Sequence, residues 1–159
     1  MPSGRAAMAS PLHLFLGIDH TAIVVGDTPA SLGCYRDLLG LRVVGESENY
    51  GTEQEHLNNV FGARLRITTL HAERGPGIEL LEYVAPRDGR PYPADERAND
   101  VMHWQTTLIA RDADVVARAL RQAGRQLVSP GVVAIDPALA NGKALLARDP
   151  DGHVMQFIA

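Results

Sequence analysis

IDHTAIVV, residues 18–25, and VMHWQTTLI, residues 101–109, open two stretches of this chain that follow the same order. Each has a histidine close to apolar and β-branched residues, a composition typical of a β-strand. The first stretch closes with GIELLEY at residues 77–83, and the second closes with DPDGHVMQFI at residues 149–158. Each copy therefore has a potential metal ligand at both ends, and a pseudo-twofold fold would bring four such side chains to one point.

Strand and helix patterns alternate as β-α-β-β-β in both halves. Each opening strand is followed by a helix whose apolar residues recur at helical spacing and which stops at a glycine, Gly40 in the first half and Gly124 in the second. Both helices are preceded by aspartates that can cap them. The stretch before Lys143 contains prolines and glycines and stays unassigned. The strands are predicted at residues 16–25, 41–45, 63–70 and 77–84, and at 102–110, 126–128, 143–147 and 153–158.

The chain divides into four segments, and its fold class is predicted to be α+β. Residues 1–13 form a flexible tail, 14–85 the first βαβββ module, 86–100 a linker rich in Pro, Asp and Arg, and 101–159 the second βαβββ module. With 159 residues, of which 45% are apolar, the chain is long and apolar enough to bury a core.

Charge and cysteine content exclude several classes of protein. A net charge of −4 and a sequence pI near 5.8 give no basic stripe for a phosphate backbone, so no nucleic-acid partner is expected. No apolar stretch reaches the roughly 18 residues that a membrane-spanning helix needs, so no membrane partner is expected either. The single cysteine, Cys34, cannot form an internal disulfide and lies in a helical pattern, as an inert buried thiol would. We expect a cytoplasmic protein.

Four motifs in order carry a resemblance to a known family. A histidine at the third position of the opening strand, YRDLLGL at residues 35–41, GIELLEY at 77–83 and DPDG at 149–152 together resemble the vicinal oxygen chelate superfamily. This superfamily includes glyoxalase I, methylmalonyl-CoA epimerase, extradiol dioxygenases, fosfomycin-resistance enzymes and bleomycin-resistance proteins. The resemblance covers residues 16–159. It implies two paired βαβββ modules that form a curved, partly open mixed sheet with the helices on its convex side, and a homodimer.

The resemblance also implies a divalent metal ion, such as Zn, Ni, Co, Mn or Fe, on the concave side of the sheet. The ligands carried over by position are His20, Glu79, His103 and Gln156. Alternation along a strand is compatible with this set, because each of these side chains shares a strand face with mostly apolar or small residues. Glu82 is a rival of Glu79, but the two point to opposite faces of their strand, and we prefer Glu79.

Gln156 departs from the glutamate that most metal enzymes of the family have at this place. An amide oxygen can bind a hard cation, but an amide cannot act as a base. Extradiol cleavage relies on two histidines and one carboxylate, and epimerisation needs two bases, whereas only Glu79 is an obvious base here. The resemblance therefore favours a glyoxalase I type of reaction, in which Glu79 moves a proton through an enediolate of a substrate with two vicinal oxygens. Glutathione or another thiol would be the co-substrate.

Two other functions stay open, and the substrate pocket is only partly indicated. A non-catalytic protein that binds an antibiotic or another small molecule, as bleomycin-resistance proteins do, shares this fold, and an extradiol dioxygenase is a third hypothesis. Arg64 and Arg66 alternate along one strand and would suit a substrate carboxylate. His56 lies in a polar loop that would border the pocket. For each of these three residues, an ordinary place on the solvated surface is the simpler interpretation.

Overall fold

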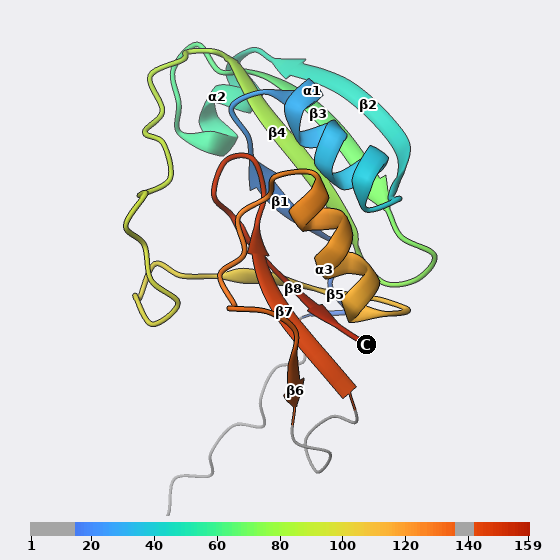
Figure 1. Cartoon of the computed structure of the whole chain (residues 1–159). Coiled ribbons are helices and arrows are strands. Elements are labelled where there is room, and N and C mark those ends of the chain that lie inside the picture. Colours follow the sequence, from blue (N-terminus) through green and yellow to red (C-terminus); the bar gives the residue numbers. More distant parts are fainter. Residues whose placement is uncertain (1–14, 136–141) are drawn as a thin grey trace, which may run out of the picture.

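The computed structural model describes residues 15–135 and 142–159, so the expected tail at residues 1–13 and part of the unassigned stretch before Lys143 lie outside it. The described chain folds into two four-stranded sheets (Figure 1). The order of strands is β1-β4-β3-β2 in the first sheet and β5-β8-β7-β6 in the second. The strands are β1 (His20–Val24), β2 (Arg42–Tyr50), β3 (Arg64–His71) and β4 (Gly77–Ala85), followed by β5 (Gln105–Ile109), β6 (Val133–Ile135), β7 (Gly142–Arg148) and β8 (Val154–Ile158).

The same pairing pattern occurs in both sheets. The opening strand runs parallel to the closing strand, β1 beside β4 and β5 beside β8, and the other neighbours are antiparallel. A parallel pair needs a crossover connection, and a helix follows the opening strand in each half. The α+β fold with two β-α-β-β-β units, predicted from the sequence, is thereby confirmed.

The helices after β1 and β5 begin after capping aspartates, although the first is not a single α-helix. It consists of α1 (Thr28–Leu32), which follows Asp27, and a π-helical continuation, η1 (Gly33–Leu38). Gly40 then adopts a φ of 80°, a conformation that glycine reaches without steric cost. The second helix is α3 (Ala113–Gln122). Within the described residues, the helices are too short and polar to cross a membrane.

Some connecting segments differ from the prediction. The polar segment after β2 contains a short helix, α2 (Thr52–Asn58), which has no buried residue and therefore no apolar stripe from which to predict it. Residues 126–128 were predicted to form a strand, but only Leu127 makes an isolated bridge there, and bends follow directly at residues 128–131. The unassigned stretch contributes the three-residue strand β6.

The beginning of β5 is the difference that matters most for the site. The strand was predicted from residue 102, with His103 on it, but it begins at Gln105. A turn occupies the preceding residues, closed by a hydrogen bond of 2.9 Å from the backbone N–H of His103 to the carbonyl of Asp100. His103 therefore precedes the strand, whereas His20 is the first residue of β1.

Both modules share one core on the helix side of the sheets. Apolar residues from β1, β4, β7 and β8 pack there with buried residues of η1 and α3. The other side of the opening strands is open, since Val24 on β1 is 63% exposed and Ile109 on β5 is 88% exposed. Alternation along β1 places His20 on this open side with Val24. The core includes Ile23, Cys34, Tyr35, Leu80, Leu120, Leu145, Met155 and Phe157.

A buried hydrogen bond joins the two modules. The Tyr35 hydroxyl on η1 donates to Asp149 Oδ2 at 2.9 Å, and Asp149 Oδ1 accepts from the backbone N–H groups of Asp151 and His153, each at 2.9 Å. Burial raises the pKa of Asp149, although these hydrogen bonds oppose the shift. The YRDLLGL and DPDG motifs, which carry the family resemblance, thus contact each other, and the contact is structural.

Candidate functional site

His20 and Glu79 lie side by side on the open face of the first sheet. Because β1 and β4 are parallel with Ala22 opposite Glu79, the side chain of His20 reaches the carboxylate from two residues away. His20 Nε2 lies 3.2 Å from Glu79 Oε2, and Thr69 Oγ1 donates to Glu79 Oε1 at 3.0 Å. The side chains of His20 and Glu79 are 37% and 23% exposed, so solvent and a small ligand can reach both. The other ring nitrogen, Nδ1, lies 2.9 Å from Asp19 Oδ2.

The rival carboxylate on β4, Glu82, points to the helix side and is buried. It accepts hydrogen bonds from the backbone N–H and hydroxyl of Thr28, at 3.2 and 2.7 Å, and from Arg66 and Arg87, each at 3.0 Å. Burial alone would raise the pKa of Glu82, but the Thr28 hydrogen bonds and the two arginines hold it below its usual value. Glu82 therefore anchors the start of α1 and the end of β4, and Glu79 is the carboxylate beside His20.

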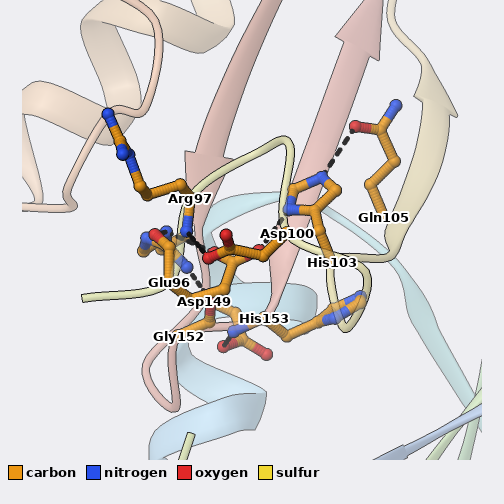
Figure 2. Close-up of polar contacts among 9 residues, drawn as sticks. Glu96, Arg97, Asp100, His103, Gln105, Asp149, Gly152 and His153 are labelled. Carbon is orange, nitrogen blue, oxygen red and sulfur yellow. Dashed lines mark hydrogen bonds and ion pairs between the residues drawn. The ribbon is translucent and has the colours of Figure 1, made fainter. Parts of the chain in front are cut away.

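His103 is held by the linker and lies apart from the open face of β1. Its Nδ1 is in close contact with a carboxylate oxygen of Glu96, whose side chain is fully buried and whose other oxygen pairs with Arg148 at 2.7 Å. Its Nε2 lies 3.4 Å from Gln105 Oε1 (Figure 2). The Arg148 hydrogen bond lowers the pKa of Glu96, with the contact to His103 adding to the shift. Glu96 is thus an ionised acceptor for both neighbours.

Strand register identifies Gln105, not His103, as the counterpart of His20. Glu79 lies opposite Ala22 in the first sheet, and Gln156 lies opposite Thr107 in the second. Two residues before Ala22 is His20, and two residues before Thr107 is Gln105. The sequence could not separate the two positions, because His103 and Gln105 differ by two residues and would share a face on one continuous strand.

Gln105 and Gln156 form a hydrogen-bonded amide pair on the open face of the second sheet. Gln105 Nε2 donates to Gln156 Oε1 at 3.0 Å, and the hydroxyl of Thr107 donates to the same oxygen at 2.9 Å. Gln105 and Thr107 are exposed, and Gln156 is half-buried. The matching positions of the two modules therefore carry an imidazole and a carboxylate in one case and two amides in the other.

The four ligands expected from the sequence fall into two clusters. His20 contacts Glu79 in the first module, whereas in the second Gln105 contacts both Gln156 and His103. Within residues 15–135 and 142–159, His, Cys, Asp and Glu side chains form no group of three that could hold a metal ion.

Only one of the expected pocket residues borders a hollow. A surface hollow of about 440 Å³ is lined by residues that include Tyr50, Glu55 and Arg64. The Arg64 guanidinium lies over the Tyr50 ring, 5.7 Å from its centroid, and pairs with Glu48. Arg66 is engaged by Glu82, and His56 is exposed on α2 outside the lining of this hollow.

The chain belongs to the Glyoxalase/Bleomycin resistance protein/Dioxygenase superfamily, whose sequence profile matches residues 17–157. Among solved structures, it is similar to a glyoxalase family protein from Bacillus cereus, with 21% identity, a TM-score of 0.76, and coverage of 96% of this chain and 97% of that one. It is also similar to the trypanothione-dependent glyoxalase I of Leishmania major, with 17% identity, a TM-score of 0.59, and coverage of 89% and 85%. These likenesses show the fold. A comparison with curated proteins found no match.

Proposed function

We propose that this protein is a metal-dependent enzyme of the glyoxalase I type, which isomerises a small substrate carrying two vicinal oxygens. The observation that carries the proposal is the 3.2 Å contact between His20 Nε2 and Glu79 Oε2 on the open face of β1 and β4. An imidazole and a carboxylate side by side suit a divalent cation, and a carboxylate can also accept and return a proton.

His20 and Glu79 fit a divalent cation as two of its ligands. The contact between His20 Nδ1 and Asp19 leaves Nε2 to face the site, which is the usual arrangement of a metal-binding histidine and its carboxylate partner. A bound cation such as Zn, Ni, Co, Mn or Fe would polarise an adjacent substrate oxygen and ease removal of a neighbouring proton.

Glu79 is the proposed base. Thr69 holds one of its oxygens at 3.0 Å, so the carboxylate keeps a fixed orientation while its other oxygen faces His20 and the open side of the sheet. Glu79 would take the proton from the carbon that carries one substrate oxygen and return it to the adjacent carbon.

We further propose that a homodimer completes the site. β1 and β5 are edge strands whose open sides expose Val24 and Ile109, and exposed apolar surface on an edge strand favours association with another chain. Twofold pairing would cover these residues and place the second module of one chain opposite His20 and Glu79 of the other. Each dimer would then contain two equivalent sites.

The test is Glu79→Gln, which keeps an oxygen for the metal and removes the base. With the hemithioacetal of glutathione and an α-ketoaldehyde as substrate, turnover should fall by roughly 100-fold or more while the metal content stays close to that of the wild type. Glu53→Gln, an exposed change on α2, serves as the matched control and should leave turnover unchanged. Full activity in Glu79→Gln would contradict the proposal.

A second candidate is a small-molecule-binding protein without chemistry. The amide pair of Gln105 and Gln156 favours it, because these neutral groups occupy the positions that hold an imidazole and a carboxylate in the first module. A wild-type protein that takes up no divalent metal from excess would support this candidate. The dioxygenase hypothesis has less support, since Gln156 stands in place of the closing-strand carboxylate that would complete its two-histidine, one-carboxylate set.

A further inference from the structure

We propose that Gln105 and Gln156 together bind an oxygen atom of the ligand, through the amide N–H groups of Gln156. In this role they replace two metal ligands that the second module would otherwise supply. This inference rests on the proposed function, because it names what the second module contributes opposite His20 and Glu79. It departs from the sequence-based expectation that His103 and Gln156 bind the metal.

The placement of the pair supports a role in the site. Both glutamines lie on the open face of the second sheet, at the positions that His20 and Glu79 occupy in the first. Their surroundings are not copies, however. Thr107 stands where the first module has Ala22, and Leu146 is opposite Gln156 where Thr69 is opposite Glu79. The threonine that donates to the closing-strand side chain is therefore Thr107 on β5 in the second module, whereas it is Thr69 on β3 in the first.

The oxygen of Gln156 is already engaged. An amide oxygen has two acceptor sites, and those of Gln156 accept from Gln105 Nε2 at 3.0 Å and from the Thr107 hydroxyl at 2.9 Å. A cation bound at this oxygen would have to displace both donors. The two N–H groups of Gln156 have no hydrogen-bond partner within residues 15–135 and 142–159. They are suited to a carboxylate, carbonyl or hydroxyl oxygen of a ligand.

His103 acts as a positioning residue for the amide pair. Figure 2 shows Glu96, His103 and Gln105 in sequence, with the Gln105 oxygen directed at the imidazole. The contact of 3.4 Å is long, yet it leaves the Gln105 amide nitrogen pointing toward Gln156. Glu96 fixes the imidazole in turn, because its buried carboxylate is held by Arg148. The linker thereby sets the orientation of the amide pair.

The first experiment follows ligand binding without metal. Protein treated with a chelator, with its glutamine side chains labelled with ¹⁵N, is titrated with lactate as a 2-hydroxycarboxylate probe, and the side-chain amide resonances are recorded by NMR. The Gln156 resonances should shift and saturate, and Gln156→Leu should weaken lactate binding roughly tenfold or more. Gln122→Leu, an exposed change on α3, should have no effect. Unmoved Gln156 resonances in the wild type would overturn the proposal.

The second experiment asks which residues bind the metal. Zn²⁺ affinity is measured by competition with a chromophoric chelator for the wild type, His20→Ala, Gln105→Ala and Gln156→Leu. The affinity should fall in His20→Ala and stay within about threefold in the glutamine variants, since their oxygens are not ligands. A fall in either glutamine variant as large as in His20→Ala would overturn the proposal. If the wild type takes up no Zn²⁺, the proposed enzyme function fails, and the lactate titration still decides the role of the amide pair.

A third variant separates positioning from general stability. His103→Ala should shift the side-chain amide resonances of Gln105 and weaken lactate binding, while Zn²⁺ affinity stays at the wild-type level. Removal of the neighbouring ring alone shifts the Gln105 resonances, so lactate affinity decides: wild-type affinity in the folded variant would overturn the positioning role.

Discussion

The open faces of the two modules match in strand register, but the side chains at the matching positions differ in chemistry. On the first, His20 and Glu79 form a pair that can carry charge, bind a cation and move a proton. On the second, the matching Gln105 and Gln156 form a neutral pair whose amides donate and accept hydrogen bonds and cannot act as a base. The two modules therefore match in strand register but differ in side-chain chemistry, and the role of each half has to be derived from its own side chains.

Replacing the imidazole and carboxylate of the first module by the glutamines of the second should have the largest effect on turnover. The double variant His20→Gln/Glu79→Gln keeps the strand register but removes both the imidazole and the base. Turnover of the hemithioacetal should fall by roughly 1,000-fold or more, and the bound metal should be lost. Steady-state kinetics and metal analysis on the same preparation check both results. Retained metal with unchanged turnover would show that His20 and Glu79 neither bind the metal nor carry the reaction.

The next largest predicted effect is a pH dependence of the free energy of unfolding that arises from His153 in the second module. Burial lowers the pKa of His153 from 6.5 to about 4, and Trp104 packs against its ring at 3.8 Å between centroids. The unfolded chain therefore binds this proton first, so the stability linked to neutral His153 is present above pH 6.5 and is lost as the pH falls toward 4. The loss should amount to about 3 kcal/mol.

Urea unfolding of the wild type and His153→Phe at a series of pH values measures this effect. The variant should show a shallower decrease in the free energy of unfolding between pH 6.5 and 4. Parallel pH profiles for the two proteins would show that His153 is protonated equally easily in the folded and unfolded states.

The reverse exchange should have a smaller effect. Gln105→His/Gln156→Glu gives the second module the side chains of the first at the matching positions. Zn²⁺ affinity should rise by roughly tenfold, because an imidazole and a carboxylate replace two neutral amides. Competition with a chelator measures the change. An unchanged affinity would mean that matching register does not give matching geometry.

The smallest predicted effect concerns the contact between the modules. Tyr35→Phe removes the hydrogen bond to the buried Asp149 and should lower the free energy of unfolding by about 1 kcal/mol. Zn²⁺ uptake should not change, since the hydroxyl is buried away from His20 and Glu79. A loss of metal in this variant would show that the contact also orients the site.

The sequence predicts the fold well because strands and crossover helices carry periodic signals. The alternation along β4 also separates Glu79 from Glu82, and the structure places the former beside His20. The sequence could not reveal the start of β5, because His103 and Gln105 would share a face on one continuous strand. The turn before the strand also has no strong sequence signal. Nor could the sequence reveal Glu96, a linker residue that meets His103 only through tertiary folding.

The most direct test of the central claim is the divalent metal content of untagged protein, compared among the wild type, His20→Ala and His103→Ala. We expect near-stoichiometric metal in the wild type, loss of that metal in His20→Ala, and retention in His103→Ala. No uptake by the wild type from excess metal, or an equal loss in both variants, would contradict it.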